Sequence, residues 1–219
     1  MTPFHFGSLE RRLFGVYDPA HNVGRALRAA VVCYPSGDEQ IHAHRTLRQL
    51  ATRMSQTGIH VLRFDYHGTG DSYGETSDGD TAGWCSDIET AIAELKDMTG
   101  AAKVSLVGLR LGANLAAHVA AARPDDIDKL VLWEPLDVEE HLRADGEKDA
   151  DSCRIDLSSV TVGLPMRTLV MLTERARRQA GFGELRVEKL VSVSPWIEER
   201  TVTGTIPVDA IQHIVNWLN

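Results

Sequence analysis

Residues 103–117, KVSLVGLRLGANLAA, carry the spacing that is most informative about chemistry. An apolar segment runs into a Gly-x-x-x-Gly turn, and a run of small residues follows the turn. This order predicts a buried strand, a tight turn from Gly108 to Gly112 and then a helix, which is the arrangement of a nucleophile elbow. Glycines flank the central residue of an elbow because its backbone is strained and neighbouring Cβ atoms would clash.

The central residue of this turn is Arg110, where an elbow would normally present a serine. A guanidinium group stays protonated at any ordinary pH, so it can neither attack a carbonyl carbon nor take up a proton. Its planar fork of N–H donors does match a carboxylate or a phosphate. The motif therefore predicts the backbone of an acyl-transfer site without its nucleophile.

Length and composition predict one globular domain over residues 1–219, with 43% hydrophobic and 25% charged residues. A net charge of -8 disfavours non-specific binding to nucleic acid or to an anionic membrane surface. The three cysteines (Cys33, Cys85 and Cys153) show neither a disulfide framework nor a zinc-site spacing. No apolar run reaches transmembrane length and the first residues lack a signal-peptide core, so a cytoplasmic protein is expected.

Strand and helix patterns alternate along the chain. Besides the elbow strand, we expect strands at residues 4–6, 12–17, 29–34, 59–65, 129–133, 168–173 and 189–193. Besides the elbow helix, we expect helices at residues 40–57 and 208–218, and one with Trp84, Ile88, Ala91, Ile92 and Leu95 on its inner face. This alternation predicts an α/β fold with a mostly parallel sheet, in which the first two strands form a hairpin.

The glycine-rich loop at residues 67–79 misses the G-x-G-x-x-G spacing of a dinucleotide site. We expect Asp65 and Asp71 to bond local backbone N–H groups there. His42 and His44 are two positions apart, so on a helix they would not share a face, and no metal site is predicted. Cys33 lies in a predicted strand and Cys85 follows a core tryptophan, so both are expected to be buried, inert thiols.

Four segments together resemble the α/β-hydrolase superfamily: YPSGDEQIHAHRTLRQLA, VLRFDYHGTGDSYGE, VSLVGLRLGANLA and LVLWEP. The sequence is most similar to the serine aminopeptidase-like (S33-type) branch, including proteins described as exosortase-system-associated hydrolases, which often carry a G-L-R-L-G elbow. The resemblance runs from about residue 4 to residue 218. It implies the α/β-hydrolase fold, with an eight-stranded sheet, helices on both faces and a reduced cap at residues 136–166.

The resemblance also implies positions for a catalytic triad. The nucleophile falls on Arg110, and the acid falls on Glu174 after the seventh strand or on Glu134 after the sixth. The histidine belongs in the loop at residues 194–207, which contains none, while His213 lies inside a predicted helix. Because the members of a triad act as a unit, the loss of both nucleophile and base argues against Ser-His-Asp chemistry.

The two donors of an oxyanion hole are backbone N–H groups, so side-chain changes do not remove them. They map to Leu111 and to the turn at residues 34–37, at Ser36. The N-terminus of the helix after Arg110 would also favour an anion there.

Two interpretations of Arg110 remain open at this point. In the first, the pocket above the elbow, where acyl transfer would occur, is converted to bind an anion. In the second, Arg110 fills this pocket and pairs with a carboxylate of the chain itself. The candidate partners are Glu39, Glu134 and Glu174.

Two classes of function follow from these interpretations. The first is a pseudoenzyme or binding protein that recognises an acidic or acyl small molecule, or a partner protein, without a cofactor. The second is an unconventional hydrolase or acyltransferase acting on an ester, thioester or amide. There Arg110 and the oxyanion donors would polarise a carbonyl and a carboxylate would activate water, although a nearby arginine lowers the pKa of such a base. A short cap would also leave room for a homodimer or a protein partner.

Overall fold

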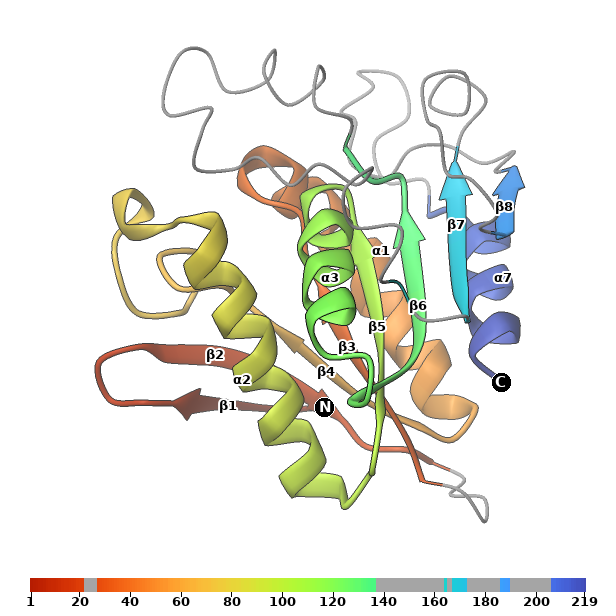
Figure 1. The fold of residues 1–219 in the computed structure, drawn as a ribbon, viewed down its shortest axis with the longest axis horizontal. Helices are drawn as coiled ribbons and strands as arrows, with labels where there is room; N and C mark the ends of the chain where they lie inside the picture. Colours follow the sequence, from red (N-terminus) through yellow and green to blue (C-terminus); the bar gives the residue numbers. More distant parts are fainter. Residues whose placement is uncertain (22–26, 137–163, 165–166, 173–185, 190–205) are drawn as a thin grey trace.

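In the computed structural model, the described residues are 1–21, 27–136, 164, 167–172, 186–189 (backbone only) and 206–219. They form one eight-stranded sheet with the order β1-β2-β4-β3-β5-β6-β7-β8 (Figure 1). The predicted α/β-hydrolase fold is confirmed. The predicted cap lies outside the described residues except at its first position and at Leu164.

A hairpin of two antiparallel strands forms one edge of the sheet. It consists of β1 (Thr2–Gly7) and β2 (Arg12–Asp18), and β2 also pairs antiparallel with β4 (Ile59–Phe64). All the other neighbouring strands are parallel. They are β3 (Arg28–Cys33), β5 (Val104–Leu109), β6 (Ile127–Trp133), β7 (Thr168–Leu172) and β8 (Arg186–Lys189).

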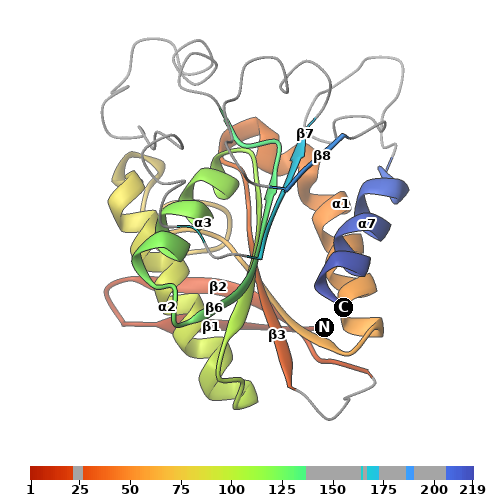
Figure 2. The ribbon, with the colours of Figure 1, turned by 45° about the vertical axis from the view of Figure 1, so that its right-hand side comes forward.

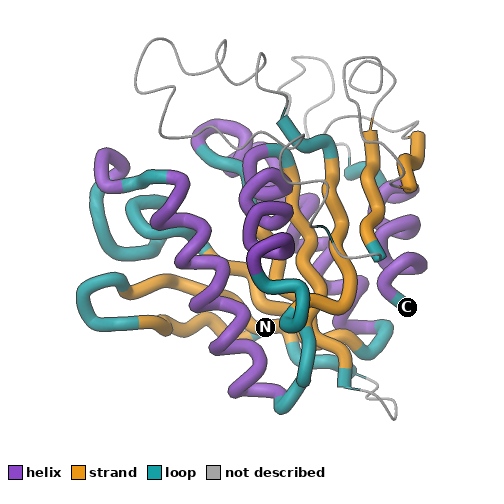
Figure 3. Tube along the Cα trace, viewed as in Figure 1, coloured by secondary structure: helices purple, strands orange, loops and turns teal. Residues whose placement is uncertain are grey.

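Helices cover both faces of this sheet, as Figures 2 and 3 show. On one face lie α2 (Thr81–Thr99) and α3 (Leu111–Ala122), and on the other lie α1 (Gly37–Gln56) and α7 (Val208–Leu218) (Figure 2). A short 3-10 helix, η1 (Thr76–Asp78), precedes α2. No helix in the described ranges is long and apolar enough to span a membrane.

Local signals explain where two helices begin and end. The Asp80 side chain accepts a hydrogen bond from the N–H of Gly83 at 2.7 Å and so caps the first turn of α2. At the other end, Gly100 has a left-handed φ of 75°, a conformation that terminates a helix and favours glycine. The helix predicted at residues 208–218 has the predicted bounds.

The position of β8 differs from the prediction. The strand was expected at residues 189–193, whereas β8 begins at Arg186, and residues 190–193 lie outside the described part. Arg186 to Lys189 lie opposite Leu169 to Leu172 of β7, so pairing with β7 places the start of the strand before its predicted start. A pattern within one segment carries no information about that register.

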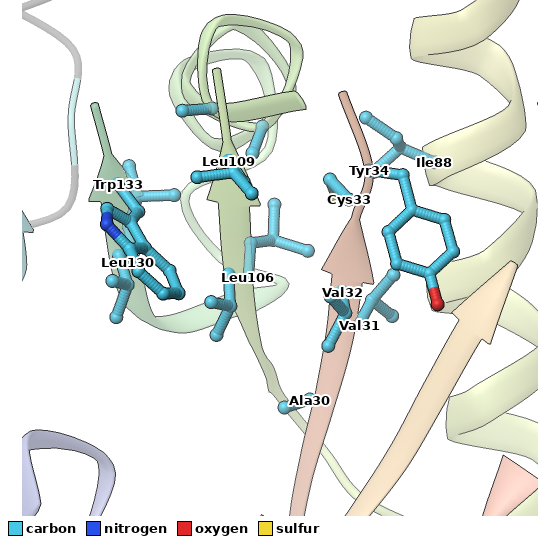
Figure 4. Packing of buried hydrophobic residues seen from close by; sticks show 14 of the residues in the cluster. Ala30, Val31, Val32, Cys33, Tyr34, Ile88, Leu106, Leu109, Leu130 and Trp133 are labelled. Atoms are coloured by element: carbon cyan, nitrogen blue, oxygen red, sulfur yellow. The ribbon is translucent and has the colours of Figure 1, made fainter. Parts of the chain in front are cut away.

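The core lies on both sides of the central strands. All six residues of β5 are buried, and the apolar side chains of β3, β5 and β6 pack together in Figure 4. Parallel strands covered by helices on both faces need such continuous apolar runs. The inner face predicted for α2 is buried as well, and consists of Trp84, Ile88, Ala91, Ile92 and Leu95.

Close backbone packing explains the two glycines of the predicted elbow. A Cβ on Gly108 would lie 2.4 Å from the carbonyl oxygen of Gly112. A Cβ on Gly112 would lie 2.3 Å from the carbonyl oxygen of Cys33 and 2.4 Å from that of Tyr34. The first turn of α3 therefore touches the carboxyl end of β3, and only glycine permits this approach.

We expect Gly112→Ala to destabilise the fold by about 3 kcal/mol or more, because its Cβ would meet backbone that cannot move aside. The cost of this clash should exceed the stabilisation of about 1 kcal/mol that alanine gives a helix relative to glycine. Gly37→Ala is the matched control, since no atom lies within 4 Å of the added Cβ and only its φ of 59° is unfavourable. We expect it to cost about 1 kcal/mol in urea unfolding. A Gly112→Ala protein as stable as the wild type would contradict this account.

Candidate functional site

The strand register brings three chain segments into one row at the carboxyl edge of the sheet. Cys33 of β3 pairs with Gly108 of β5, and Leu109 of β5 pairs with Trp133 of β6. The residues that follow these strands are therefore neighbours, and Figure 4 shows the three strand ends together. Because parallel strands end at the same edge, this edge is where an α/β sheet collects a site.

Arg110 occupies the turn between β5 and α3 with φ 54° and ψ -123°. Residues with a side chain avoid positive φ, and Glu134 (φ 46°) is the only other non-glycine residue in this region among those described. The N–H of Arg110 donates to the carbonyl oxygen of Trp133 at 3.0 Å, and its carbonyl oxygen accepts from Ala113 at 2.9 Å. The predicted strained turn is present and is held from both sides.

The Arg110 side chain is only 9% exposed, so its charge needs a partner. Its Nε donates to Oε1 of Glu39 at 3.1 Å, and its Nη1 approaches the carbonyl oxygen of Glu134 at 3.5 Å. Of the three predicted partners, Glu39 offers its carboxylate and Glu134 its backbone. Glu174 lies outside the described residues.

Glu134 follows β6 and is buried, with 4% of its surface exposed. Its N–H donates to the carbonyl oxygen of Met171 at 2.8 Å, which links the end of β6 to β7. Together with the bond between Arg110 and Trp133, this contact joins the ends of three neighbouring strands. Glu134 is thus part of the floor of the site.

The predicted oxyanion donors flank the same turn. Leu111 is the first residue of α3, and Ser36 is the N-cap of α1. The close contact of Gly112 with Cys33 and Tyr34 places the start of α3 against the chain that leads to Ser36. Both helices therefore begin at this edge, where their N-termini contribute partial positive charge.

Asn114 is a site residue that the sequence did not single out. Its side-chain amide donates to the carbonyl oxygen of Leu136 at 2.9 Å, and its carbonyl accepts from the Leu136 N–H at 2.9 Å. It is buried one helical turn after Arg110. The available signal was a polar residue within a helix of small residues. The two hydrogen bonds of Asn114 fix the chain that follows β6.

The aspartates of the glycine-rich loop behave differently from one another. Asp65 accepts a hydrogen bond from the N–H of Asp71 at 3.1 Å, as predicted, and a second from Gln40 at 3.0 Å. The prediction was wrong for Asp71, which contributes its backbone N–H and forms no carboxylate hydrogen bond within the described residues. An exposed loop position leaves its carboxylate in solvent.

No group of three or more potential metal ligands occurs among the described residues. Cys33 is buried inside β3, and burial raises the pKa of its thiol well above the ordinary value. Cys85 was expected to be buried, but it is only half-buried, because it lies beside the inner face of α2. Burial and then the neighbouring acids Glu89 and Asp87 raise the pKa of its thiol to about 12. His213 lies within α7, as predicted, and α7 packs on α1.

Comparison with known proteins adds the family. The family model described as serine aminopeptidase, S33, matches residues 27–146, which is more than half of the chain. The chain belongs to this family. Comparison with curated proteins finds no match.

Solved structures with low sequence identity share the fold. A serine hydrolase without lid from Xanthomonas campestris has a TM-score of 0.70 at 17% identity, covering 99% of this chain and 93% of its own. The enol-lactonase from Burkholderia xenovorans has a TM-score of 0.68 at 16% identity, covering 98% and 99%. Proline iminopeptidase from Mycobacterium smegmatis has a TM-score of 0.63 at 12% identity, covering 99% and 97%. At these identities the likeness concerns the fold alone.

We expect Glu39→Gln to destabilise the protein by about 1–2 kcal/mol, because the Nε of a nearly buried guanidinium loses the carboxylate that it contacts. The matched control is Glu89→Gln, which removes one of the two carboxylate partners of the more exposed Arg123. Glu89→Gln should change the free energy of unfolding by no more than about 0.5 kcal/mol. Chemical unfolding of the three proteins makes the comparison, and equal losses would refute a special role for the Arg110 pair.

Cys85 should react with iodoacetamide at pH 8 on the order of a thousandfold more slowly than an unperturbed cysteine. With a pKa of about 12, its thiol stays protonated at pH 8 and only the thiolate reacts. Peptide mapping by mass spectrometry measures the rate, and the guanidinium-unfolded protein serves as control. Labelling of the native protein at the unfolded rate would contradict the raised pKa of Cys85.

Proposed function

We propose that this member of the S33 family is a non-hydrolytic binding protein, whose pocket holds a small acidic or acyl molecule with its carboxylate against Arg110. One observation carries the proposal. A guanidinium stands at the centre of the strained turn, where an acyl-transfer site needs a nucleophile. The substitution of a serine by Arg110 within this family is part of the proposal.

The surroundings of Arg110 support an anion. The start of α3 supplies the N–H of Leu111 and the positive end of a helix dipole, and Ser36 lies at the start of α1. Donors fixed by the backbone need no rearrangement to receive a carboxylate. An anion bound there would meet one full positive charge and the partial charges of two helix ends.

In this proposal, the carboxylate of Glu39 occupies the position that the carboxylate of the ligand would take. It contacts Arg110 through one oxygen at 3.1 Å, and 32% of its side chain is exposed. The Glu39 side chain can therefore turn towards solvent when another anion binds the guanidinium of Arg110. The internal pair and the anion site are then two states of the same arginine.

The hydrolytic alternative has less support. The enol-lactonase and the proline iminopeptidase share the fold, so acyl chemistry is compatible with the scaffold. Arg110 and the backbone donors would also suit a polarised carbonyl. A carboxylate against a guanidinium is stabilised in its charged form, however, which makes Glu39 a poor general base. Glu134 is buried, and residues 194–207 contain no histidine.

Calorimetric titration with acetate, butyrate, phenylacetate and phosphate tests the anion site. We expect Arg110→Gln to weaken binding about tenfold or more, because a charge-assisted hydrogen bond is lost. Arg110→Lys should restore part of the affinity, since a point charge lacks the planar fork. Glu39→Gln should bind more tightly than the wild type, because the internal competitor has lost its charge.

An activity panel of esters, thioesters and aminoacyl amides provides the opposing test. We expect no turnover by the wild type or by Arg110→Ser, because a serine without a histidine base stays unactivated. Turnover that is lost in Arg110→Ala would overturn the binding-protein proposal and support the unconventional hydrolase. Anion binding unchanged in Arg110→Gln would equally overturn it.

A further inference from the structure

The sheet ends at β1, and within the described part of the chain no strand pairs with the outer side of β1 (Figure 1). Along an edge strand, backbone groups that face the neighbouring strand alternate with groups that face outward. Phe14 of β2 shows which are which, because its N–H and C=O bond residues that follow β4, on the side away from β1. His5 lies opposite Phe14. The backbone groups of His5, and of Pro3 and Gly7 on either side, therefore face outward.

The two edges of the sheet differ in charge. The sequence of β1, TPFHFG, contains no Lys, Arg, Asp or Glu, and its register with β2 runs from Thr2 to Gly7 without a bulge. At the opposite edge, three of the four residues of β8 (RVEK) are charged. Charges and bulges on an edge strand disfavour its pairing with another chain. The edge at β1 therefore lacks the protection that β8 carries.

Aromatic contacts on both faces of the sheet hold β1 in place. On one face, the buried ring of Phe6 packs edge-on against Phe64, with 6.1 Å between the ring centroids. On the other face, the ring of His5 packs edge-on against Phe14 at 5.4 Å and Tyr73 at 6.3 Å. A strand that is already ordered loses little conformational entropy when it pairs with another.

The outward groups of β1 are complementary to those of a second β1 in antiparallel orientation. When His5 lies opposite His5 of the second copy, the N–H of each donates to the C=O of the other. Pro3 then lies opposite Gly7 of the second copy. Because proline has no N–H, Pro3 only accepts a hydrogen bond, and Gly7 can donate it. The one proline of the strand is thus accommodated in this register.

The residues at the two ends of β1 fit the same arrangement. Met1 before the strand is 59% exposed and Leu9 after it is 83% exposed. Antiparallel pairing brings the beginning of one β1 to the end of the other, so Met1 would lie near Leu9 of the second copy, and their burial would favour association. Each copy carries a net charge of -8, and a strand without charged residues lets two such copies meet without like charges in direct contact.

We propose that two copies of this chain associate through β1, so that their sheets continue into one another across a two-fold axis at His5. The second copy is the occupant because the outward edge of β1 is complementary to itself. Each copy offers this edge once, so the pairing closes as a dimer and does not extend into a filament. A contact of one strand is small, so monomer and dimer exchange. The association does not depend on anion binding at Arg110.

Sedimentation velocity of the full chain between about 2 and 500 µM tests the proposal, and we expect the dimer fraction to rise across this range. His5→Pro should weaken the dimer about tenfold or more, because each copy loses the N–H that crosses the axis. His5→Ala is the matched control, since it removes the same ring but keeps the N–H, and it should weaken the dimer about threefold at most. The outward N–H of His5 has no partner among the described residues, so proline should leave the monomer folded.

Cysteine cross-linking tests the register. His5→Cys should give a disulfide-linked dimer under mild oxidation, because directly opposed Cα atoms in a hydrogen-bonded antiparallel pair lie about 5.5 Å apart. Thr2→Cys is the matched control, since the two copies of this position would lie about 20 Å apart along the paired strands, too far for a disulfide. Peptide mapping by mass spectrometry identifies the linked residue.

A further pair of variants tests the contact at the ends of the strands. Leu9→Lys should weaken the dimer about threefold or more, because a charge replaces apolar surface near Met1 of the second copy. Ile41→Lys makes the same kind of change at a position of α1 that is 73% exposed and outside β1. It should leave the dimer affinity unchanged in sedimentation velocity.

Any one of three results would overturn the proposal. The first is a wild-type chain that remains monomeric at about 500 µM. The second is a dimer that His5→Pro and His5→Ala weaken equally. The third is cross-linking of Thr2→Cys as fast as that of His5→Cys. Both cysteine variants replace exposed side chains, so cross-linking decides the question even if His5→Pro fails to fold.

Discussion

The contact between the first turn of α3 and the carboxyl end of β3 is the constraint on which the site depends. It requires a glycine, because a Cβ on Gly112 would overlap the carbonyl oxygen of Cys33. The chain must therefore reverse direction within one residue after β5, and Arg110 absorbs the reversal with a positive φ. The same approach brings the Arg110 side chain to the beginning of α1, where Glu39 receives it.

Burial explains why charged side chains near this edge of the sheet differ in their need for a partner. An isolated charge removed from water costs several kcal/mol, so the guanidinium of Arg110 must always have a partner. The carboxylates of Asp38, Asp71 and Glu75 are exposed, and water stabilises them without a cation. The guanidinium of Arg110 is instead neutralised from within, so the proposed anion would bind there by exchange with a carboxylate of the chain.

Features encoded within one segment were predictable from the sequence. The spacing of Gly108 and Gly112 located the strained turn, and the apolar periodicity gave α7 its observed bounds. Features that depend on pairing between segments were not predictable. The start of β8 at Arg186 follows from its register with β7, and the contact of Glu39 with Arg110 follows from the order of the strands. The role of Asn114 has no signature in any single stretch, because its partner Leu136 comes from a separate part of the chain.

The order β2-β4-β3-β5 has a consequence for how the protein matures. Arg110 and Glu39 are separated by 71 residues, and α1, β4 and α2 all lie between the neighbouring strands β3 and β5. A chain that has been synthesised only through α2 can pair β3 with β4, but it lacks Arg110 and so cannot form the proposed anion site. Closing so long a connection is entropically costly, and non-local pairing of this kind is slow. The proposed anion site therefore requires β5 to dock at the centre of the sheet, and any opening that detaches β5 would abolish it.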